Sequence, residues 1–198
     1  MCKLCELKPV YEFTNQRKLC KNCFVRWFEK KFFYTIRRFQ MISKNDKIGY
    51  ENKKDFRNIV LIELLELLEQ RSPVEIVAPK GVPSASKNVP SAEGKEGRKK
   101  ANKIAVADTI DVIAKEFIKN SVNKTLKNNL SPVDKKIIKP LYLFLDKELL
   151  IYANLRGLKY NKILKKKSEK WVNFVNNLEQ KHPEIKRAIV NSYLELFA

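Results

Sequence analysis

The sequence has little histidine, glycine or cysteine, the residue types on which many catalytic and phosphate-binding sites depend. Among 198 residues there are one histidine, five glycines and four cysteines. No uninterrupted apolar run reaches the ~20 residues that a membrane-spanning helix needs, so we expect no transmembrane segment. No signal peptide precedes Cys2, and we therefore expect the chain to stay in a reducing compartment, the cytoplasm.

All four cysteines lie near the start of the sequence, as two C-x2-C pairs. Cys2 with Cys5 and Cys20 with Cys23 are separated by fourteen residues. Each pair offers two thiolates from one tight turn, and two pairs close a tetrahedral site that suits zinc. Few apolar residues lie between the pairs, so this segment needs a metal in order to fold. The pattern predicts a structural metal module over residues 1–23, with zinc as the expected metal and iron as the alternative.

Disulfide bonds and a catalytic zinc are the two alternatives to a structural metal at these cysteines. Paired disulfides would require an oxidising compartment, and a redox C-x2-C motif normally lies within a βαβ unit. A catalytic zinc would need an open coordination position, which four protein ligands do not leave. Both alternatives fit this sequence less well than a closed four-thiolate site.

The chain is strongly basic. Lysine and arginine number 41 against 22 aspartates and glutamates, which gives a formal net charge of +19 at pH 7. This excess favours an anionic partner, for which RNA, DNA and an anionic membrane all qualify by charge. Because lysine dominates over arginine, a proteome with generally lysine-rich surfaces is the alternative explanation.

Aromatic residues at helical spacing follow the second cysteine pair, with basic residues between them. They predict a basic amphipathic helix over residues 24–41, within a connecting segment over residues 24–46. We expect the aromatic stripe to belong to the core and the basic face to contact phosphate, without reading sequence. The candidate RNA-binding residues are Arg26, Lys30, Lys31, Arg37 and Arg38 on this helix, and Lys99, Lys100 and Lys166 in two later clusters.

The rest of the sequence alternates between β-rich runs and helical patterns. Strands are predicted at 47–50, 74–78, 103–108 and 136–139, and helices at 56–70, 110–120, 147–156, 168–180 and 184–197. Asp108 or Thr109 is the expected cap of the second of these helices, Asp146 caps the third, and Gly157 closes it. This order predicts an α/β domain over residues 47–164 with a parallel sheet and flanking helices. A mobile loop over residues 79–97 interrupts it, and C-terminal helices follow over residues 165–198.

These features, in this order, resemble the cytoplasmic tRNA 2-thiolation protein 2 family. Its members open with two C-x2-C pairs followed directly by phenylalanine and a basic helix, as Cys20, Cys23 and Phe24 do here. The segment 104–114 is similar to the G-D-S-x-T-x-x-A turn of the non-catalytic subunit. The segment from Ile138 to Tyr152 is similar to a P-L-x-x-x…K-E…Y pattern of both subunits, and 174–190 to their closing helix pair.

The sequence departs from the catalytic members of that family at three places. They carry the loop S-G-G-K-D-S, whose backbone N–H groups hold phosphate. The corresponding stretch 51–56 has no glycine, and only Lys54 and Asp55 match. The sequence has no cysteine after Cys23 to act as a nucleophile or cluster ligand. Ala107-Asp108-Thr109 replaces the family's G-H-N.

The resemblance implies a non-catalytic chain with a reduced Rossmann-like sheet of the PP-loop ATPase (HUP) type, which binds no nucleotide. We expect it to support a catalytic paralogue with an intact loop in the 2-thiolation of wobble uridine, and to extend the surface that binds tRNA. It would not be an enzyme itself. A stand-alone zinc-module RNA-binding protein is one alternative, and an active ATP-dependent tRNA sulfurtransferase, supported by Lys54 and Asp55, is the other.

Overall fold

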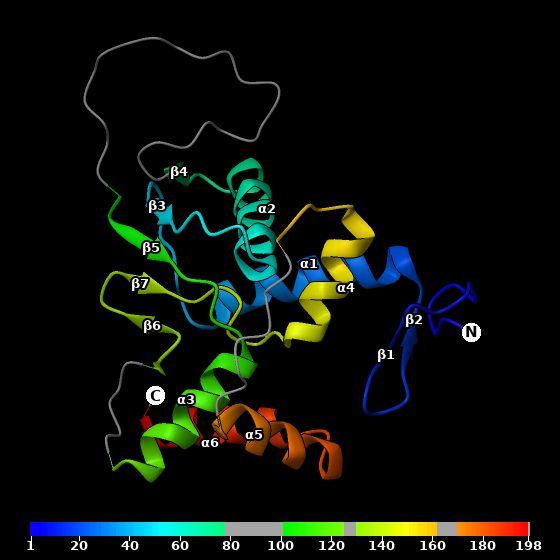
Figure 1. The fold of residues 1–198 in the computed structure, drawn as a ribbon. Coiled ribbons are helices and arrows are strands. Elements are labelled where there is room, and N and C mark those ends of the chain that lie inside the picture. Colours follow the sequence, from blue (N-terminus) through cyan, green and yellow to red (C-terminus); the bar gives the residue numbers. More distant parts are fainter. Residues whose placement is uncertain (78–100, 125–129, 162–169, 198) are drawn as a thin grey trace.

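The chain forms a mixed α/β fold in the computed structural model, which describes residues 1–77, 101–124, 130–161 and 170–197 (Figure 1). A short antiparallel hairpin at the N-terminus pairs β1 (Tyr11–Glu12) with β2 (Lys18–Leu19). A second sheet has the strand order β4-β3-β5-β7-β6. Its strands are β3 (Lys47–Tyr50), β4 (Glu75–Val77), β5 (Lys103–Ala105), β6 (Val133–Asp134) and β7 (Ile137–Ile138). The loop predicted over 79–97 lies outside the described residues.

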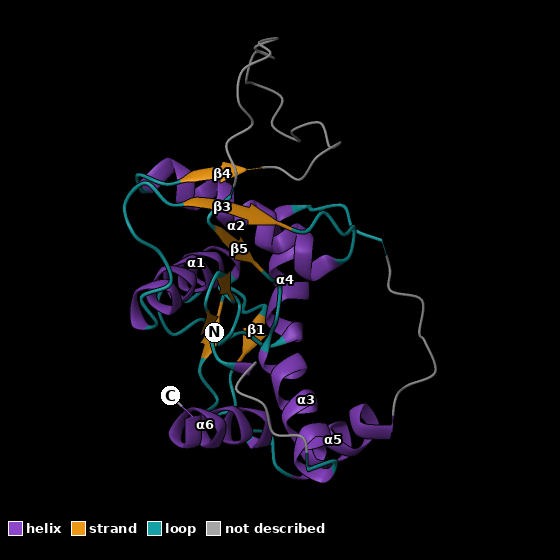
Figure 2. Cartoon of the chain, turned by 90° about the vertical axis from the view of Figure 1, so that its left-hand side faces the viewer, coloured by secondary structure: helices purple, strands orange, loops and turns teal. Residues whose placement is uncertain are grey.

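The described helices gather in two groups. They are α1 (Lys21–Arg38), α2 (Phe56–Arg71), α3 (Ile110–Val122), α4 (Asp146–Arg156), α5 (Lys170–Lys181) and α6 (Ile185–Phe197). Helices α1, α2 and α4 pack on one another at one side of the larger sheet (Figures 1 and 2). Helices α3, α5 and α6 contact one another beyond the β6 end of that sheet. None of the described helices is long and apolar enough to cross a membrane.

The predicted parallel sheet is confirmed for four of its five strands. β3 runs parallel to both β4 and β5, and β5 runs parallel to β7. β6 is antiparallel to β7 and was not predicted. It has only two residues, and the turn after it places Lys135 at a φ of 51°. A positive φ is uncommon for a residue other than glycine, so the lysine gave no indication of this turn.

Helix α1 begins and ends three residues earlier than its periodicity predicts. It starts at Lys21, so that Cys20 is its N-cap and Cys23 lies in its first turn. It ends where Gln40 takes a φ of 48°. The N–H of Met41 donates to the Ile36 carbonyl at 3.0 Å, and the N–H of Gln40 donates to the Arg37 carbonyl at 3.2 Å. This is the Schellman pattern of a helix end, here without the usual glycine.

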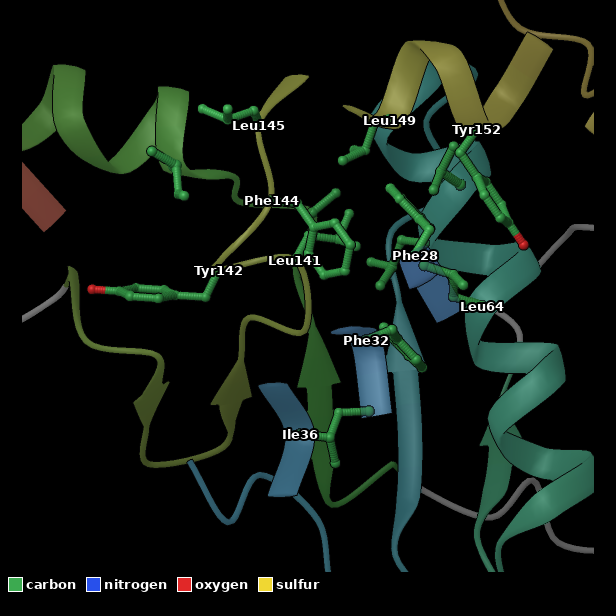
Figure 3. Packing of buried hydrophobic residues seen from close by; sticks show 14 of the residues in the cluster. Phe28, Phe32, Ile36, Leu64, Leu141, Tyr142, Phe144, Leu145, Leu149 and Tyr152 are labelled. Carbon is green, nitrogen blue, oxygen red and sulfur yellow. The ribbon is translucent and has the colours of Figure 1, made fainter. Parts of the chain in front are cut away.

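The aromatic stripe of α1 belongs to the core, as predicted. Phe24, Phe28 and Phe32 are fully buried. The Phe28 ring stacks on Tyr152 of α4, with ring centroids 4.3 Å apart, and lies 4.6 Å from Phe144 (Figure 3). The stripe therefore packs α1 against α4 as well as against the N-terminal hairpin, where Phe24 lies 5.1 Å from the Tyr11 ring.

One buried carboxylate joins four parts of this fold. Glu148 of α4 is fully buried, and its two oxygens accept hydrogen bonds from the Lys31 ammonium at 2.6 Å and the Arg187 guanidinium at 3.0 Å. The Tyr11 hydroxyl at 3.3 Å and the backbone N–H of Leu145 at 3.1 Å are its other donors. The N-terminal hairpin, α1, α4 and α6 therefore share one anion. Burial lowers the pKa of Lys31 to about 8, although the attraction of Glu148 acts in the opposite direction.

Replacing Glu148 with glutamine tests this arrangement. The substitution removes the charge that neutralises the largely buried Lys31 ammonium and one of the two carboxylate partners of Arg187. We therefore expect the free energy of unfolding to fall by about 3 kcal/mol. The matched control is Glu184→Gln, because Glu184 pairs with the same Arg187 but is 54% exposed; its cost should stay below about 1 kcal/mol. Urea denaturation measures both, and similar losses for the two variants would contradict the assignment.

Candidate metal centre and nucleic-acid interface

The four cysteines that the sequence singled out meet at the start of α1. Their Sγ atoms all lie within 4.8 Å of one another. Cys5 Sγ is 3.2 Å from Cys20 Sγ and 3.6 Å from Cys23 Sγ. All four are free thiols rather than disulfides. The predicted convergence of the two pairs is therefore confirmed.

The local backbone explains how the two pairs come together. Glu6 takes a φ of 60°, and its N–H donates to the Cys2 carbonyl at 3.1 Å, which closes the first turn. The N–H of Lys3 donates to the Lys18 carbonyl at 3.0 Å and ties that turn to β2. The second pair comes from the first turn of α1, which follows β2 directly.

Hydrogen bonds from the backbone favour thiolates on one member of each pair. Burial acts to raise the pKa of Cys2, but hydrogen bonds from the backbone of Leu4 and Cys20 outweigh it and lower the pKa to about 6. A backbone hydrogen bond from Cys23 at the start of α1 lowers the pKa of Cys20. The Cys5 side chain raises the pKa of Cys23 to about 12. Four thiolates therefore coexist here only when a cation neutralises them.

The donor set fits one tetrahedral ion. Four sulfurs this close together can each reach a shared centre at the ~2.3 Å of a zinc–thiolate bond. A four-iron cluster would place four irons between the thiolates and would hold them further apart. With four protein ligands the ion has no open position, so its effect would be structural: it would hold the hairpin on the first turn of α1.

Three of the predicted RNA-binding residues form an exposed stripe on α1. Arg26, Lys30 and Arg37 are exposed and follow one another at spacings of four and seven residues, which places them on one face of the helix. In the part of the chain that the structure describes, none of the three forms an ion pair. Arg38 is also exposed, with its guanidinium carbon 5.4 Å from the centroid of the Phe39 ring. We call Arg26, Lys30 and Arg37 the α1 stripe.

Lys31 does not belong to this surface, which corrects the prediction from sequence. Its side chain is 12% exposed, and its ammonium is bound to Glu148. The same ammonium lies 4.7 Å from the Trp27 ring centroid and 4.6 Å from that of Phe144. A cation held by a carboxylate and two aromatic faces is directed into the protein. The remaining candidates, Lys99, Lys100 and Lys166, lie outside the described residues.

The loop between β3 and α2 corresponds to the stretch 51–56, where the resemblance stated from sequence would place a phosphate. Asp55 occupies that position as the N-cap of α2. Its carboxylate accepts hydrogen bonds from the N–H groups of Arg57 at 3.0 Å and Asn58 at 3.2 Å. Helix N–H groups that would otherwise face an anion are therefore already bound to a carboxylate of the chain itself.

A network of charges that the sequence did not reveal lies beside this loop. Asp146 accepts hydrogen bonds from Arg57 Nε at 2.8 Å and from Thr109 Oγ1 at 2.7 Å. Its own N–H donates to Asp111, which also binds the Lys186 ammonium at 2.5 Å. Asp146 is thus the first residue of α4 rather than its cap, and Thr109 is a cap residue whose hydroxyl binds another helix. Because these partners are 35 to 89 residues apart in sequence, no local sequence pattern predicts their contacts.

Comparison with known proteins identifies the fold. No protein-family model matches the sequence, and no curated protein matches it either. Among solved structures, the U34-tRNA thiolase NcsA from Methanococcus maripaludis, with its 4Fe–4S cluster, is similar along 99% of this chain and 86% of its own. The TM-score is 0.77 and the sequence identity is 20%. This chain therefore shares the fold of that thiolase.

This similarity corrects one expectation from sequence. The missing glycine-rich loop led to the prediction that the chain is not an enzyme. A solved structure that shares its fold is a thiolase, and therefore an enzyme. The fold gives no ground for describing the chain as an inactive relative.

Metal removal tests the role of the cysteine site. We expect a strong chelator to lower the midpoint of thermal unfolding, because the free energy of metal binding is also folding free energy for the hairpin. The Cys20→Ser variant should have a low midpoint from the start and respond little to the same chelator. Elemental analysis of the untreated protein should find one ion per chain. A wild-type midpoint that the chelator leaves unchanged would exclude a structural metal.

Proposed function

We propose that this chain acts in the 2-thiolation of uridine 34 in tRNA. The observation that carries the proposal is the shared fold, which aligns with a U34-tRNA thiolase along 99% of this chain. The formal net charge of +19 and the exposed cations of the α1 stripe support a nucleic-acid substrate.

We propose zinc as the metal, held by Cys2, Cys5, Cys20 and Cys23. The chemistry of the donor set supports it, because four thiolates within 4.8 Å suit a closed tetrahedral site. The ion would fix the hairpin to α1 and so set the position of the α1 stripe, whose first member follows Cys23 by three residues.

The α1 stripe would bind tRNA through phosphate. Its ammonium and guanidinium groups have no carboxylate partner in the described chain, so they remain available to an anion. Contacts of this kind position an RNA without selecting its sequence. The choice of the uridine would then depend on residues outside the α1 stripe.

Cellular tRNA provides the test of the function. We expect tRNA from cells that lack this chain to contain less 2-thiouridine at position 34, as measured by mass spectrometry of digested tRNA, and the wild-type chain to restore it. Restoration should be weaker with an Arg26→Gln/Lys30→Gln variant. A 2-thiouridine content that does not depend on the chain would contradict the proposal. It would favour the second candidate, a stand-alone RNA-binding protein with a zinc module, provided that tRNA still binds.

Direct binding tests the α1 stripe. Arg26→Gln and Lys30→Gln should each weaken tRNA binding in a filter or fluorescence assay. Each should also reduce the slope of log K against log salt by about one, because one phosphate contact is lost. The matched control is Lys53→Gln, which changes net charge equally but removes an exposed lysine already paired with Glu51. Equal effects of all three substitutions would assign the affinity to net charge alone.

The expected protein partner stays a prediction. It is a tRNA 2-thiolation subunit with an intact phosphate-binding loop. Mass spectrometry of the proteins that co-purify with the chain identifies such a partner or excludes it.

A further inference from the structure

A cavity of about 700 Å³ opens between the C-terminal ends of α1 and α2. Its size lies within the roughly 300–1,000 Å³ range of small-ligand pockets. The lining combines an aromatic ring, aliphatic side chains and two guanidinium groups: Phe33, Ile36, Ile42, Leu68, Arg37 and Arg71. We call it the α1–α2 pocket.

This pocket is separate from the edge of the sheet where the fold would bind a phosphate. Ile42 precedes β3, and Ser72 precedes β4, so the pocket lies at the amino ends of these parallel strands. The loop that ends at Asp55 follows the carboxyl end of β3. The two sites are therefore at opposite ends of the same strand.

The pocket offers flat surfaces and positive charge together. Phe33 is half-buried, and the guanidinium carbon of Arg71 lies 5.4 Å from the centroid of its ring. Arg71 is 55% exposed, and its ion pair with Glu29 is long, at 3.9 Å. Arg37 has no ion pair among the described residues. Aromatic rings and guanidinium planes stack on nucleobases, and guanidinium groups bind phosphate in a bidentate manner.

The pocket continues the α1 stripe. Phe33 lies between Lys30 and Arg37 at spacings of three and four residues, so it shares their face of the helix. Arg37 belongs to both features, since it is the last residue of the stripe and part of the pocket wall. An RNA strand whose phosphates follow the stripe would therefore reach the pocket.

We propose that the α1–α2 pocket binds one unpaired nucleotide of an RNA strand held by the α1 stripe. The base would stack on Phe33 and Arg71 over the aliphatic floor, and Arg37 would hold its phosphate. This inference rests on the proposed function for the identity of the RNA, a tRNA, but the pocket itself recognises a single-stranded nucleotide of any sequence.

Two aromatic neighbours on α1 provide a matched test. Phe33→Leu keeps an apolar side chain in the pocket but removes the ring. Tyr34→Leu removes a ring that is 49% exposed and does not line the pocket. With a fluorescent oligouridylate as the probe, we expect Phe33→Leu to weaken binding at least about fivefold. Tyr34→Leu should change the affinity by less than about twofold.

Arg37→Gln is a second variant that should not disturb the packing of the core, because Arg37 is exposed. It should weaken oligouridylate binding more than it weakens binding of a short RNA duplex, which cannot place a base in the pocket. A 5-iodouridine oligonucleotide should crosslink to the peptide that contains Phe33. Equal losses for Phe33→Leu and Tyr34→Leu, equal losses of duplex and single strand, or crosslinks confined to other elements would each overturn the proposal.

The two proposals fail in different ways. If oligouridylate binding depends on Phe33 but the 2-thiouridine content does not depend on the chain, the pocket proposal is supported and the role in thiolation is rejected. If the 2-thiouridine content depends on the chain but Phe33→Leu binds RNA as the wild type does, the role in thiolation is supported and the pocket proposal is rejected.

Discussion

The position of α1 depends on the buried Glu148 carboxylate. An isolated anion in a protein interior is costly, and here two cations, a hydroxyl and a backbone N–H offset that cost. Because its donors come from the N-terminal hairpin, α1, α4 and α6, these elements must dock together or leave charges unpaired. This interaction also turns Lys31 inward, which leaves Arg26, Lys30 and Arg37 as the outward cations of the same helix.

The metal site acts on the same helix at its N-terminal end. Cys20 caps α1 and Cys23 lies in its first turn, so the hairpin and the helix cannot separate while four thiolates share an ion. The aromatic residues of α1 then continue the contact into α4 through Phe28 and Tyr152. A small hairpin with little core of its own is thus held by coordination at one end and by packing along the helix.

Sequence patterns predicted the local features of this fold and failed where distant segments meet. Cysteine spacing predicted the thiolate cluster, and β-rich residues predicted β3 with its observed bounds. Helical periodicity placed Lys31 on a basic face but could not show that Glu148, 117 residues later, takes up its charge. The Asp146 network and the α1–α2 pocket were missed for the same reason, since each is built from separate helices. The expectation that the chain is not an enzyme was wrong for a different reason. It was inferred from the absence of one glycine-rich motif, before the fold was known.

A fold fixes where its strands end, but the side chains at those ends decide what binds there. At the carboxyl end of β3, Asp55 brings its own negative charge to the start of α2, where an incoming phosphate would meet it. At the amino end of the same strand, the α1–α2 pocket has two guanidinium groups and no carboxylate in its lining. The two ends of the strand therefore differ in what they offer an anion: at one end the helix N–H groups are already bound to Asp55, and at the other two guanidinium groups line a pocket. A polyanion that follows the α1 stripe away from the metal is attracted towards the pocket at every step, since each residue of the stripe is a cation and the last of them forms part of the pocket wall.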